Sequence, residues 1–462
     1  MDPTDCFRPS SRQGLRASSN CPDLMDYAGF VNWMFKLERF GIKLGLENIT
    51  EFLSRIGDPH KDLRAVHVTG TNGKGSVCAF ISQILTTHGV KVGLYTSPHL
   101  VDFRERIRIR GEMIEEEDVL RIGLALKKVM EEMAEESKEQ QLTFFEFTTG
   151  MAFEYFKEKN VEMVVAEVGM GGRLDATNVL NPEVAVITRI GLEHTNYLGS
   201  TIQEIAREKA GIVKASVPVV TCEAQSDALA VILNVCRRKG AQLKRIGEDF
   251  VAENITQSIS GTEFEYRGML SAKFRTRLLG RYQAENAAAA IAVVELLHDR
   301  GVHVTPGEVR KGIMETRWPG RLDVVSKDPL VILDGSHNPD GVSITAKELV
   351  DLGVTPLTFV LGCMDDKDAT GIVRAIAPIA SGIICTQARF KRALPAAALA
   401  SVVKGEYAGP SNIIESSAEA FEEGLRSRTG RGLCVIGSLY LVGEAIPWWE
   451  NRNKCPGAAH KV

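Results

Sequence analysis

One short stretch of the chain carries the residue types that bind a nucleotide phosphate. Residues 65–68 (AVHV) predict a buried strand, and residues 70–76 (GTNGKGS) form a small-residue turn directly after it. Apolar residues at helical spacing follow over residues 77–88, so the turn leads into an amphipathic helix. Glycines let the backbone approach a phosphate, N–H groups at the helix start point at it, and Lys74 adds positive charge. The stretch predicts a phosphate site.

The sequence of this turn differs from that of the usual phosphate-binding loop. In that pattern Ser or Thr follows the lysine directly, whereas Gly75 separates Lys74 from Ser76 here, and Val68 stands where the first glycine would be. Tight turns without any ligand are also rich in glycine. The interpretation therefore depends on context, namely a strand before the turn, a helix after it and a lysine inside it.

Polar residues follow four further predicted strands. The strands are expected at 91–96, 163–168, 184–190 and 330–333, and they lead to residues 97–99 (SPH), 167–175 (EVGMGGRLD), 191–194 (GLEH) and 334–338 (DGSHN). Ligands bind beyond the carboxyl ends of the strands in an open parallel sheet. Together with the turn, these segments predict one site along one sheet edge, with a second domain facing it.

Glu167 and His194 have side chains that suit a metal. Glu167 ends an apolar run near the phosphate turn, where nucleotide-binding proteins keep a carboxylate for magnesium. A capping carboxylate is the alternative, but an unpaired buried acid is costly. His194 is either a core histidine or a ligand, and its position on the same edge favours a metal or phosphate role.

Lys209 lies on the apolar face of a helix predicted over residues 201–213, at i+7 from Ile202 and i+4 from Ile205. A buried ammonium needs a partner, a lowered pKa or a modification. The alternative is an aliphatic stem whose charged end reaches the surface. Reaction with carbon dioxide would turn this amine into a carbamate, an anion that suits magnesium.

The length, composition and net charge of the chain limit the classes of protein to which it can belong. The chain of 462 residues is long enough for two or three domains, and its 44% hydrophobic and 25% charged residues are ordinary for a globular protein. A net charge of −4 gives no electrostatic reason to expect nucleic acid, and no apolar run approaches a membrane span. Nine scattered cysteines without a CxxC pair predict reduced thiols in a cytoplasmic protein.

The fold class follows from strands and helices that alternate from residue 65 onward. This order predicts an α/β protein with a large, mostly parallel sheet covered by helices on both faces, and a smaller α/β domain after it. Further strands are expected at 217–221, 357–361, 382–386 and 433–436, and residues 250–280 are expected to be antiparallel and peripheral. We expect a disordered tail over 1–25, domains over 26–315 and 320–445, and a loose tail over 446–462.

Many segments together resemble one family. They are GTNGKGS (70–76), TSPHL and the ERI segment within 96–111, FFEF (144–147), EVGMGGRLDATN (167–178), GLEHTNYLG (191–199), IAREKAGI (205–212), RYQAENAAAA (281–290), RWPGRLD (317–323), DGSHNPDG (334–341), GCMDDKD (362–368) and GSLYLVGE (437–444). In this order they resemble the folylpolyglutamate synthase and dihydrofolate synthase family, which belongs to the Mur ligase group of ATP-dependent amide ligases. The likeness covers about residues 26–445.

The resemblance implies a fold and a reaction. Residues 26–315 would be the P-loop-type ATP-binding central domain, and residues 320–445 a Rossmann-like glutamate ligase domain. ATP would phosphorylate a carboxylate of folate or dihydropteroate, and the amine of L-glutamate would attack the acyl phosphate to give an amide, ADP and phosphate. A bifunctional, monomeric enzyme with small-molecule partners only is expected.

The resemblance also implies roles for particular residues. The phosphates would be held by Asn72, Gly73, Lys74, Gly75 and Ser76, and the ATP side completed by Asn286, Arg321, Asp334 and His337. Two Mg²⁺ ions would bind, one to Ser97 and Glu167, the other to His194 and a carbamylated Lys209. Lys74, His194 and Lys209 would be the catalytic residues. The pterin would lie near Phe144, Phe145, Arg173, Leu174 and Asp175, although plain helix core is the alternative for the aromatic rings.

Other functions remain open at this point. A Mur-type ligase could act on another pterin or carboxylate acceptor, and a peptidoglycan-type ligase would need a further N-terminal domain for which residues 1–64 are too few. A nucleotide-binding regulatory protein without ligase activity is the alternative of another class, and an ATPase or kinase is the third. Lys74, Glu167, His194 and Lys209 together favour an enzyme.

Overall fold

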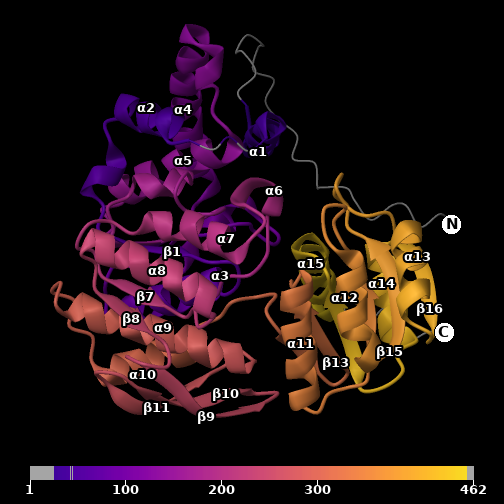
Figure 1. Ribbon diagram of the computed structural model, residues 1–462. Coiled ribbons are helices and arrows are strands. Elements are labelled where there is room, and N and C mark those ends of the chain that lie inside the picture. The colour runs from indigo at the N-terminus through magenta and orange to yellow at the C-terminus, as the bar shows by residue number, and fades with distance from the viewer. Residues whose placement is uncertain (1–24, 42, 44, 455–462) are drawn as a thin grey trace.

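Two α/β domains lie side by side (Figure 1), and the chain passes from one to the other over residues 316–322. The computed structural model describes residues 25–41, 43 and 45–454. The expected disordered tail therefore lies, except for its last residue, outside the described residues. No described helix is long and apolar enough to cross a membrane.

The first domain is built on an eight-stranded sheet in the order β4-β3-β2-β5-β1-β6-β7-β8. The strands are β1 (Ala65–Thr69), β2 (Val92–Tyr95), β3 (Ile107–Ile109), β4 (Glu112–Met113), β5 (Met163–Glu167), β6 (Val184–Ile187), β7 (Val219–Thr221) and β8 (Leu243–Arg245). The six strands from β2 to β8 in this order are parallel, as predicted, whereas β3 and β4 add an antiparallel edge. Central β1 pairs with both β5 and β6, so the turn after β1 lies between the ends of those strands.

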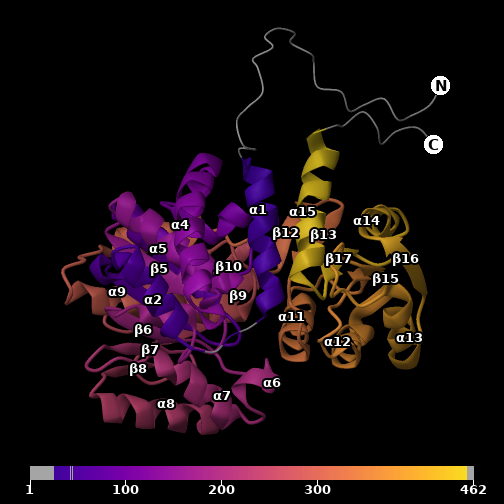
Figure 2. The same cartoon turned by 90° about the horizontal axis from the view of Figure 1, so that it is seen from above.

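Helices cover both faces of this sheet, because successive residues of its strands point to opposite sides. On one face lie α3 (Lys74–Thr87), α9 (Arg281–His298) and α10 (Pro306–Glu315). The other face carries α1 (Tyr27–Lys36), α2 (Glu47–Arg55), α4 (Glu116–Glu136), α5 (Phe144–Glu158), α7 (Ile202–Lys209) and α8 (Ser226–Lys239). Figure 2 shows short α6 (Thr195–Leu198) beside α7. The predicted antiparallel segment is a separate sheet of β9 (Val251–Ser258), β10 (Gly261–Arg267) and β11 (Ser271–Thr276).

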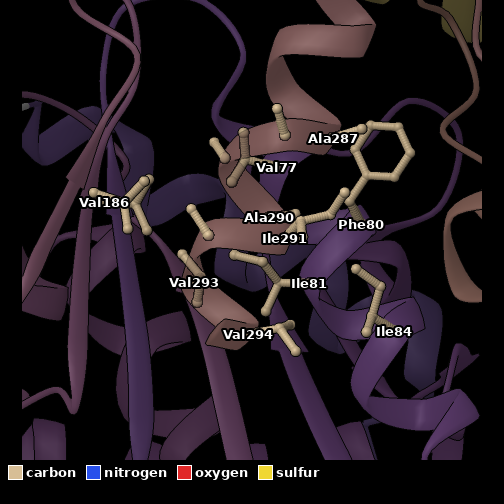
Figure 3. Close-up of a cluster of buried hydrophobic side chains, with 14 of the residues drawn as sticks. Val77, Phe80, Ile81, Ile84, Val186, Ala287, Ala290, Ile291, Val293 and Val294 are labelled. Atoms are coloured by element: carbon tan, nitrogen blue, oxygen red, sulfur yellow. The ribbon is translucent and has the colours of Figure 1, made fainter. Parts of the chain in front are cut away.

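Packing of α3 against α9 fixes the helix that follows the glycine turn. Phe80, Ile81 and Ile84 of α3 are fully buried, and they meet Ala287 and Ala290 of α9 in one core (Figure 3). The alanine side chains of α9 are short, so the two helices can approach closely. Burying each large apolar side chain contributes about 1.5–3 kcal/mol, so the start of α3 is held in place from within the core.

The second domain has a six-stranded sheet in the order β12-β13-β17-β14-β15-β16. The strands are β12 (Asp323–Lys327), β13 (Leu330–Asp334), β14 (Leu357–Leu361), β15 (Ala380–Gln387), β16 (Ser411–Ser416) and β17 (Gly432–Ile436), and only β12 is antiparallel. Its helices are α11 (Pro339–Asp351), α12 (Ala369–Ile376), α13 (Ala396–Glu406), α14 (Ser417–Arg426) and α15 (Leu439–Lys454). A smaller α/β domain is thereby confirmed, with β12 and β16 as strands that the sequence pattern did not predict.

The expected loose tail from residue 446 is wrong for its first part. Helix α15 continues to Lys454, through Pro447. The reason is an apolar face: Ala445 is fully buried, and the Trp448 ring lies 5.3 Å from the ring of Phe421 in α14. Residues 455–462 lie outside the described residues.

His67 brings a titratable group into the centre of the first sheet. Its side chain is fully buried in β1, and Nε2 lies 2.8 Å from Oγ1 of Thr177. The Thr177 hydroxyl donates to Oδ1 of Asp175, so it must accept from His67, which fixes the proton on Nε2. Among the described residues Nδ1 has no hydrogen-bond partner. Burial, with the charge of Lys214, lowers the pKa of His67 to about 3.

His67 therefore predicts a loss of stability in acid. The unfolded chain takes up a proton near the ordinary pKa of 6.5, but the folded chain does not until about 3, so stability falls as pH drops through this window. In His67→Gln the free energy of unfolding should depend less on pH there, by up to about 1.4 kcal/mol per pH unit. Urea unfolding of both proteins across the window measures the difference. Above about pH 7 that difference should be constant; identical slopes in acid would contradict the assignment.

Candidate active site

A cavity of about 320 Å³ lies between the two domains, at the carboxyl ends of their strands. From the first domain its lining includes residues 71–76, Ser97, Glu167, Arg189, Glu193, His194, Tyr282, Glu285 and Asn286. From the interdomain segment and the second domain come Arg321, Ser336, His337, Asn338, Asp366, Lys367, Arg392, Ser438 and Tyr440. The structure therefore brings together eleven of the predicted residues: Asn72, Gly73, Lys74, Gly75, Ser76, Ser97, Glu167, His194, Asn286, Arg321 and His337.

The glycine turn has a backbone that other residues could not adopt. Gly73 has φ +94°, and a Cβ there would lie 2.7 Å from Oδ1 of Asn286. Thr71 N–H donates to the Arg189 carbonyl at 2.8 Å, which ties the turn to the loop after β6. The Lys74 ammonium donates to the carbonyls of Gly70 and Thr71 at 3.1 and 3.2 Å. Its charge is therefore held inside the turn, where a phosphate would meet both it and the start of α3.

Glu167 is a buried carboxylate with few partners. It ends β5 with 5% of its surface exposed, and Oε2 accepts the Ser97 N–H at 3.1 Å. Burial raises the pKa of Glu167, against the opposing effects of Lys74 and the Ser97 N–H. A cation beside it would remove the cost of burying this charge. Among the described residues no group of three or more His, Cys, Asp or Glu could hold a metal. One carboxylate plus phosphate oxygens and water is, however, a normal set for Mg²⁺.

His194 lies at the start of α6, with a left-handed backbone at φ 52°. Its side chain is exposed at the surface, but the surrounding protein removes enough water from the ring to lower its pKa, and the charges of Lys367 and Lys74 act in the same direction against Glu193. The imidazole is therefore neutral near pH 7 and has a nitrogen lone pair free to bind a metal or accept a hydrogen bond.

Glu193, next to His194, connects the two domains. Its Oε1 lies 3.4 Å from Nε2 of His337 and 3.8 Å from Nζ of Lys367, both in the second domain. Burial alone would raise the pKa of Glu193, but the His337 contact outweighs it and holds the pKa well below its usual range. Glu193 is thus an ionised bridge across the cavity.

Lys209 is buried, as its position on the apolar helix face predicted. Only 4% of its surface is exposed, and Nζ donates to the Gly70 carbonyl at 2.7 Å. Burial, with the positive charge of Lys74, lowers the pKa of Lys209 to about 7. About half of the amine is neutral at that pH, but the side chain lies behind the turn and is not among the residues that line the cavity.

Asp334 has a different environment from the one expected for an ATP ligand. Its side chain is fully buried, and it accepts the Leu322 and Ser336 N–H groups at 2.8 and 3.0 Å and the Thr345 hydroxyl at 3.1 Å. It does not line the cavity. Instead it ties the segment between the domains to β13 and to α11, and so positions Arg321 and His337.

The residues expected near a pterin lie outside the lining of this cavity. Phe144 stacks on Phe35 at 5.4 Å within the core, and the ring of Phe145 lies against Gly169, where a Cβ would come within 2.6 Å of it. Arg173 pairs with Glu208 at 2.9 Å, and Leu174 is partly exposed beside it. Asp175 is buried and accepts the Met170 and Thr177 N–H groups. A ligand role for these five residues stays a prediction.

Several lining residues were not predicted. They are Arg189, Glu193, Tyr282, Glu285, Lys367, Arg392, Ser438 and Tyr440. Glu193, Lys367, Ser438 and Tyr440 lie inside segments that the family likeness already included, and each follows a strand, so their signal was present. Arg189 lies inside the strand predicted over 184–190, and Arg392 is an ordinary loop arginine in the sequence, so only the folded chain shows them at the cavity.

These features define a class of protein: an ATP-dependent ligase in which a phosphate turn faces a second α/β domain across a cavity. The Mur ligase middle domain model matches residues 68–294, and the Mur ligase, glutamate ligase domain model matches residues 320–439.

Known relatives narrow this class. The chain is 35% identical to a "dihydrofolate synthase/folylpolyglutamate synthase" of Bacillus subtilis, over 90% of this chain and 98% of that one. It is also 35% identical to a "probable bifunctional folylpolyglutamate synthase/dihydropteroate synthase" of Haloferax volcanii, covering 92% of this chain but only 51% of that protein.

A Mycobacterium tuberculosis folylpolyglutamate synthase solved with ADP and AMPPCP superimposes with a TM-score of 0.85. It is 29% identical and covers 92% of this chain and 99% of that one. The chain belongs to the folylpolyglutamate synthase and dihydrofolate synthase family of Mur ligases, enzymes that form carbon–nitrogen bonds at the expense of ATP.

Gly73→Ala should weaken ATP binding. The new Cβ meets Asn286 and the backbone is strained at φ +94°, so the turn must shift away from the phosphate. We expect an ATP dissociation constant raised by at least about tenfold in calorimetry, a loss of roughly 1.4 kcal/mol. Gly89→Ala is the matched control, since Gly89 has φ +102° with open space around it. It should cost stability but leave the ATP affinity unchanged; equal affinities for all three proteins would refute the role of the turn.

Proposed function

We propose that this protein joins L-glutamate to the carboxylate of dihydropteroate and to the glutamyl carboxylate of tetrahydrofolate. The observation that carries the proposal is the cavity itself, where Lys74 and Glu167 of one domain face Lys367, Arg392 and His337 of the other. Support for the two acceptors comes from the Bacillus subtilis relative, whose name includes both activities and which this chain matches along nearly its full length.

The reaction needs a phosphorylated intermediate, because a carboxylate is a poor electrophile. The acceptor carboxylate attacks the γ-phosphorus of ATP, and ADP leaves with the electron pair of the broken bond. The glutamate amine then attacks the acyl carbon, inorganic phosphate leaves, and the amine loses a proton to give the amide. Lys74 and the N–H groups at the start of α3 stabilise the charge on the transferring phosphoryl group.

Glu167 and Ser97 would hold a Mg²⁺ ion beside the phosphates, which suits the raised pKa of Glu167. Magnesium supplies charge neutralisation at the phosphoryl oxygens when bound. His194, which has an exposed side chain and a lowered pKa, is a candidate for a second ion. The cavity lies between the two domains, and their enclosure of it would exclude water from an intermediate that water would hydrolyse.

Lys209 would react with carbon dioxide to form a carbamate. The neutral amine attacks the carbon of carbon dioxide, a proton is released, and the side chain becomes an anion. The lowered pKa of Lys209 supports this, because near pH 7 much of the amine carries a free lone pair. Its contact with Gly70 places it directly behind the phosphate turn.

Other acceptors and a ligase-free ATPase stay as alternatives. A different pterin or carboxylate acceptor would use the same phosphoryl chemistry, so only product analysis separates it. A regulatory protein that merely binds nucleotide has no use for the cations on the second domain's wall, and this favours the ligase.

Product analysis of the wild type tests the ligase function, and the variant Glu167→Gln tests the role of this carboxylate. Purified protein with ATP, magnesium and L-glutamate should convert dihydropteroate and tetrahydrofolate to products heavier by one glutamyl residue, measured by mass spectrometry. The amide variant keeps the shape of the side chain but loses its charge, so kcat should fall by at least about a hundredfold in a folded protein. Phosphate release by the wild type without a glutamylated product from either acceptor would refute the ligase function.

The carbamate has a spectroscopic test that does not depend on activity. In ¹³C-bicarbonate buffer the wild type should show an additional carbonyl resonance that is absent from Lys209→Met. Lys214→Met is the control, because Lys214 is also partly buried with a lowered pKa but donates to the Asn178 carbonyl instead of to the turn. A spectrum of the wild type that matches that of Lys209→Met would exclude the modification.

A further inference from the structure

Arg392 is a cation at the cavity that the phosphoryl chemistry does not use. It follows β15 and lines the cavity, and 51% of its side chain is exposed. The Asp365 N–H donates to the Arg392 carbonyl at 2.9 Å, and the Leu394 N–H donates to the Cys363 carbonyl at 2.9 Å. These two bonds join the loop after β15 to the loop after β14, so the backbone beneath Arg392 is fixed.

The Arg392 side chain rests on a pair of aromatic rings. Its guanidinium carbon lies 5.5 Å from the centre of the Phe390 ring, and Phe390 stacks on Tyr440 with centres 4.1 Å apart and planes at 15°. Tyr440 itself lines the cavity. A guanidinium over an aromatic face is oriented before any ligand arrives, and its planar fork matches a carboxylate.

The charges around Arg392 leave it open to an anion. The nearest carboxylate oxygen is Oδ1 of Asp366, at 3.9 Å from Nη1, which is too far for a hydrogen bond. Lys367 differs, since only 15% of its side chain is exposed and it lies 3.8 Å from carboxylate oxygens of both Glu193 and Asp366. Within the described part of the second domain's wall, Arg392 is the more accessible of these two cations.

We propose that Arg392 binds the side-chain carboxylate of the incoming L-glutamate, an inference that rests on the proposed function. The amine and the α-carboxylate of glutamate are bonded to the same carbon, so the α-carboxylate must stay near the acyl phosphate. In this proposal it lies near the Glu193–Lys367 contact. The side-chain carboxylate lies three bonds further along. Strand β15, which precedes Arg392, is one strand further out than β14, which precedes Lys367. The two cations lie on either side of one carboxylate, since Asp366 is 3.8 Å from Lys367 and 3.9 Å from Arg392, so each carboxylate of the substrate has a cation of its own.

Steady-state kinetics of Arg392→Gln test this subsite. Dihydropteroate is the acceptor, because it carries no glutamate of its own and so excludes binding of an acceptor tail. With ATP saturating, KM for L-glutamate should rise at least about tenfold, while KM for ATP and kcat stay within about twofold, because a charge-assisted bond to the substrate is lost. Lys391→Gln, a neighbouring exposed residue that does not line the cavity, should leave all constants unchanged.

A second measurement separates the two carboxylates of the substrate. L-Norvaline has the amine and the α-carboxylate but a propyl side chain without charge, so its inhibition constant should be the same for the wild type and Arg392→Gln. An equal loss for L-norvaline and L-glutamate would assign Arg392 to the α-carboxylate and overturn the proposal. An unchanged KM for L-glutamate would also overturn it.

A conservative variant keeps the proposal testable if Arg392→Gln does not fold. Arg392→Lys keeps the charge but loses the planar fork, so it should raise KM for L-glutamate by less than Arg392→Gln does. If Arg392→Gln does not fold, an unchanged KM in folded Arg392→Lys contradicts the proposal by itself. A wild type that forms no glutamylated product would refute the proposed function instead, so the two failures are distinct.

Discussion

One carbonyl oxygen, that of Gly70, accepts hydrogen bonds from two lysine side chains, and much of the site depends on this meeting. Lys74 reaches it from the start of α3 at 3.1 Å, and Lys209 reaches it from the end of α7 at 2.7 Å. Burial and, to a smaller extent, the nearby charge of Lys74 both favour the neutral amine of Lys209. The more deeply buried Lys209 gives up its proton more easily, whereas Lys74 stays at the cavity. Gly70 itself is obligatory, since a Cβ there would overlap the Thr188 side chain.

Lys74 and Lys209 can share the Gly70 carbonyl because the surrounding elements hold both side chains in place. The packing of α3 on α9 fixes one lysine, and the burial of Ile205 and Ala206 in α7 fixes the other. Central β1 supplies the shared carbonyl from between β5 and β6. The same arrangement carries Glu167 and His194 to the edge of the sheet. The edge that carries the candidate site is therefore a product of sheet order.

The sequence predicted the parts of the molecule that have local signals. Strands β1 and β5 are continuous apolar runs, and the buried face of Lys209 follows from helical periodicity, so the first sheet and most of its catalytic edge could be predicted. Burial of Asp334 behind the cavity could not, because its partners at Leu322 and Thr345 come from separate elements. The position of Arg392 also depends on pairing between two loops that no periodicity encodes. Helix α15 extends beyond residue 445 because Trp448 packs against Phe421 of α14, although most residues around this tryptophan are polar.

The Glu193 bridge has a consequence for how the enzyme opens. Its contacts with His337 and Lys367 join a loop of the first domain to two loops of the second, across the space that substrates must enter. Separation of the domains exposes these three groups to water and to dissolved ions, and screening over about 8 Å at physiological ionic strength makes the separated state less costly. Salt should therefore weaken this electrostatic link between the two domains, in which one carboxylate faces both His337 and Lys367.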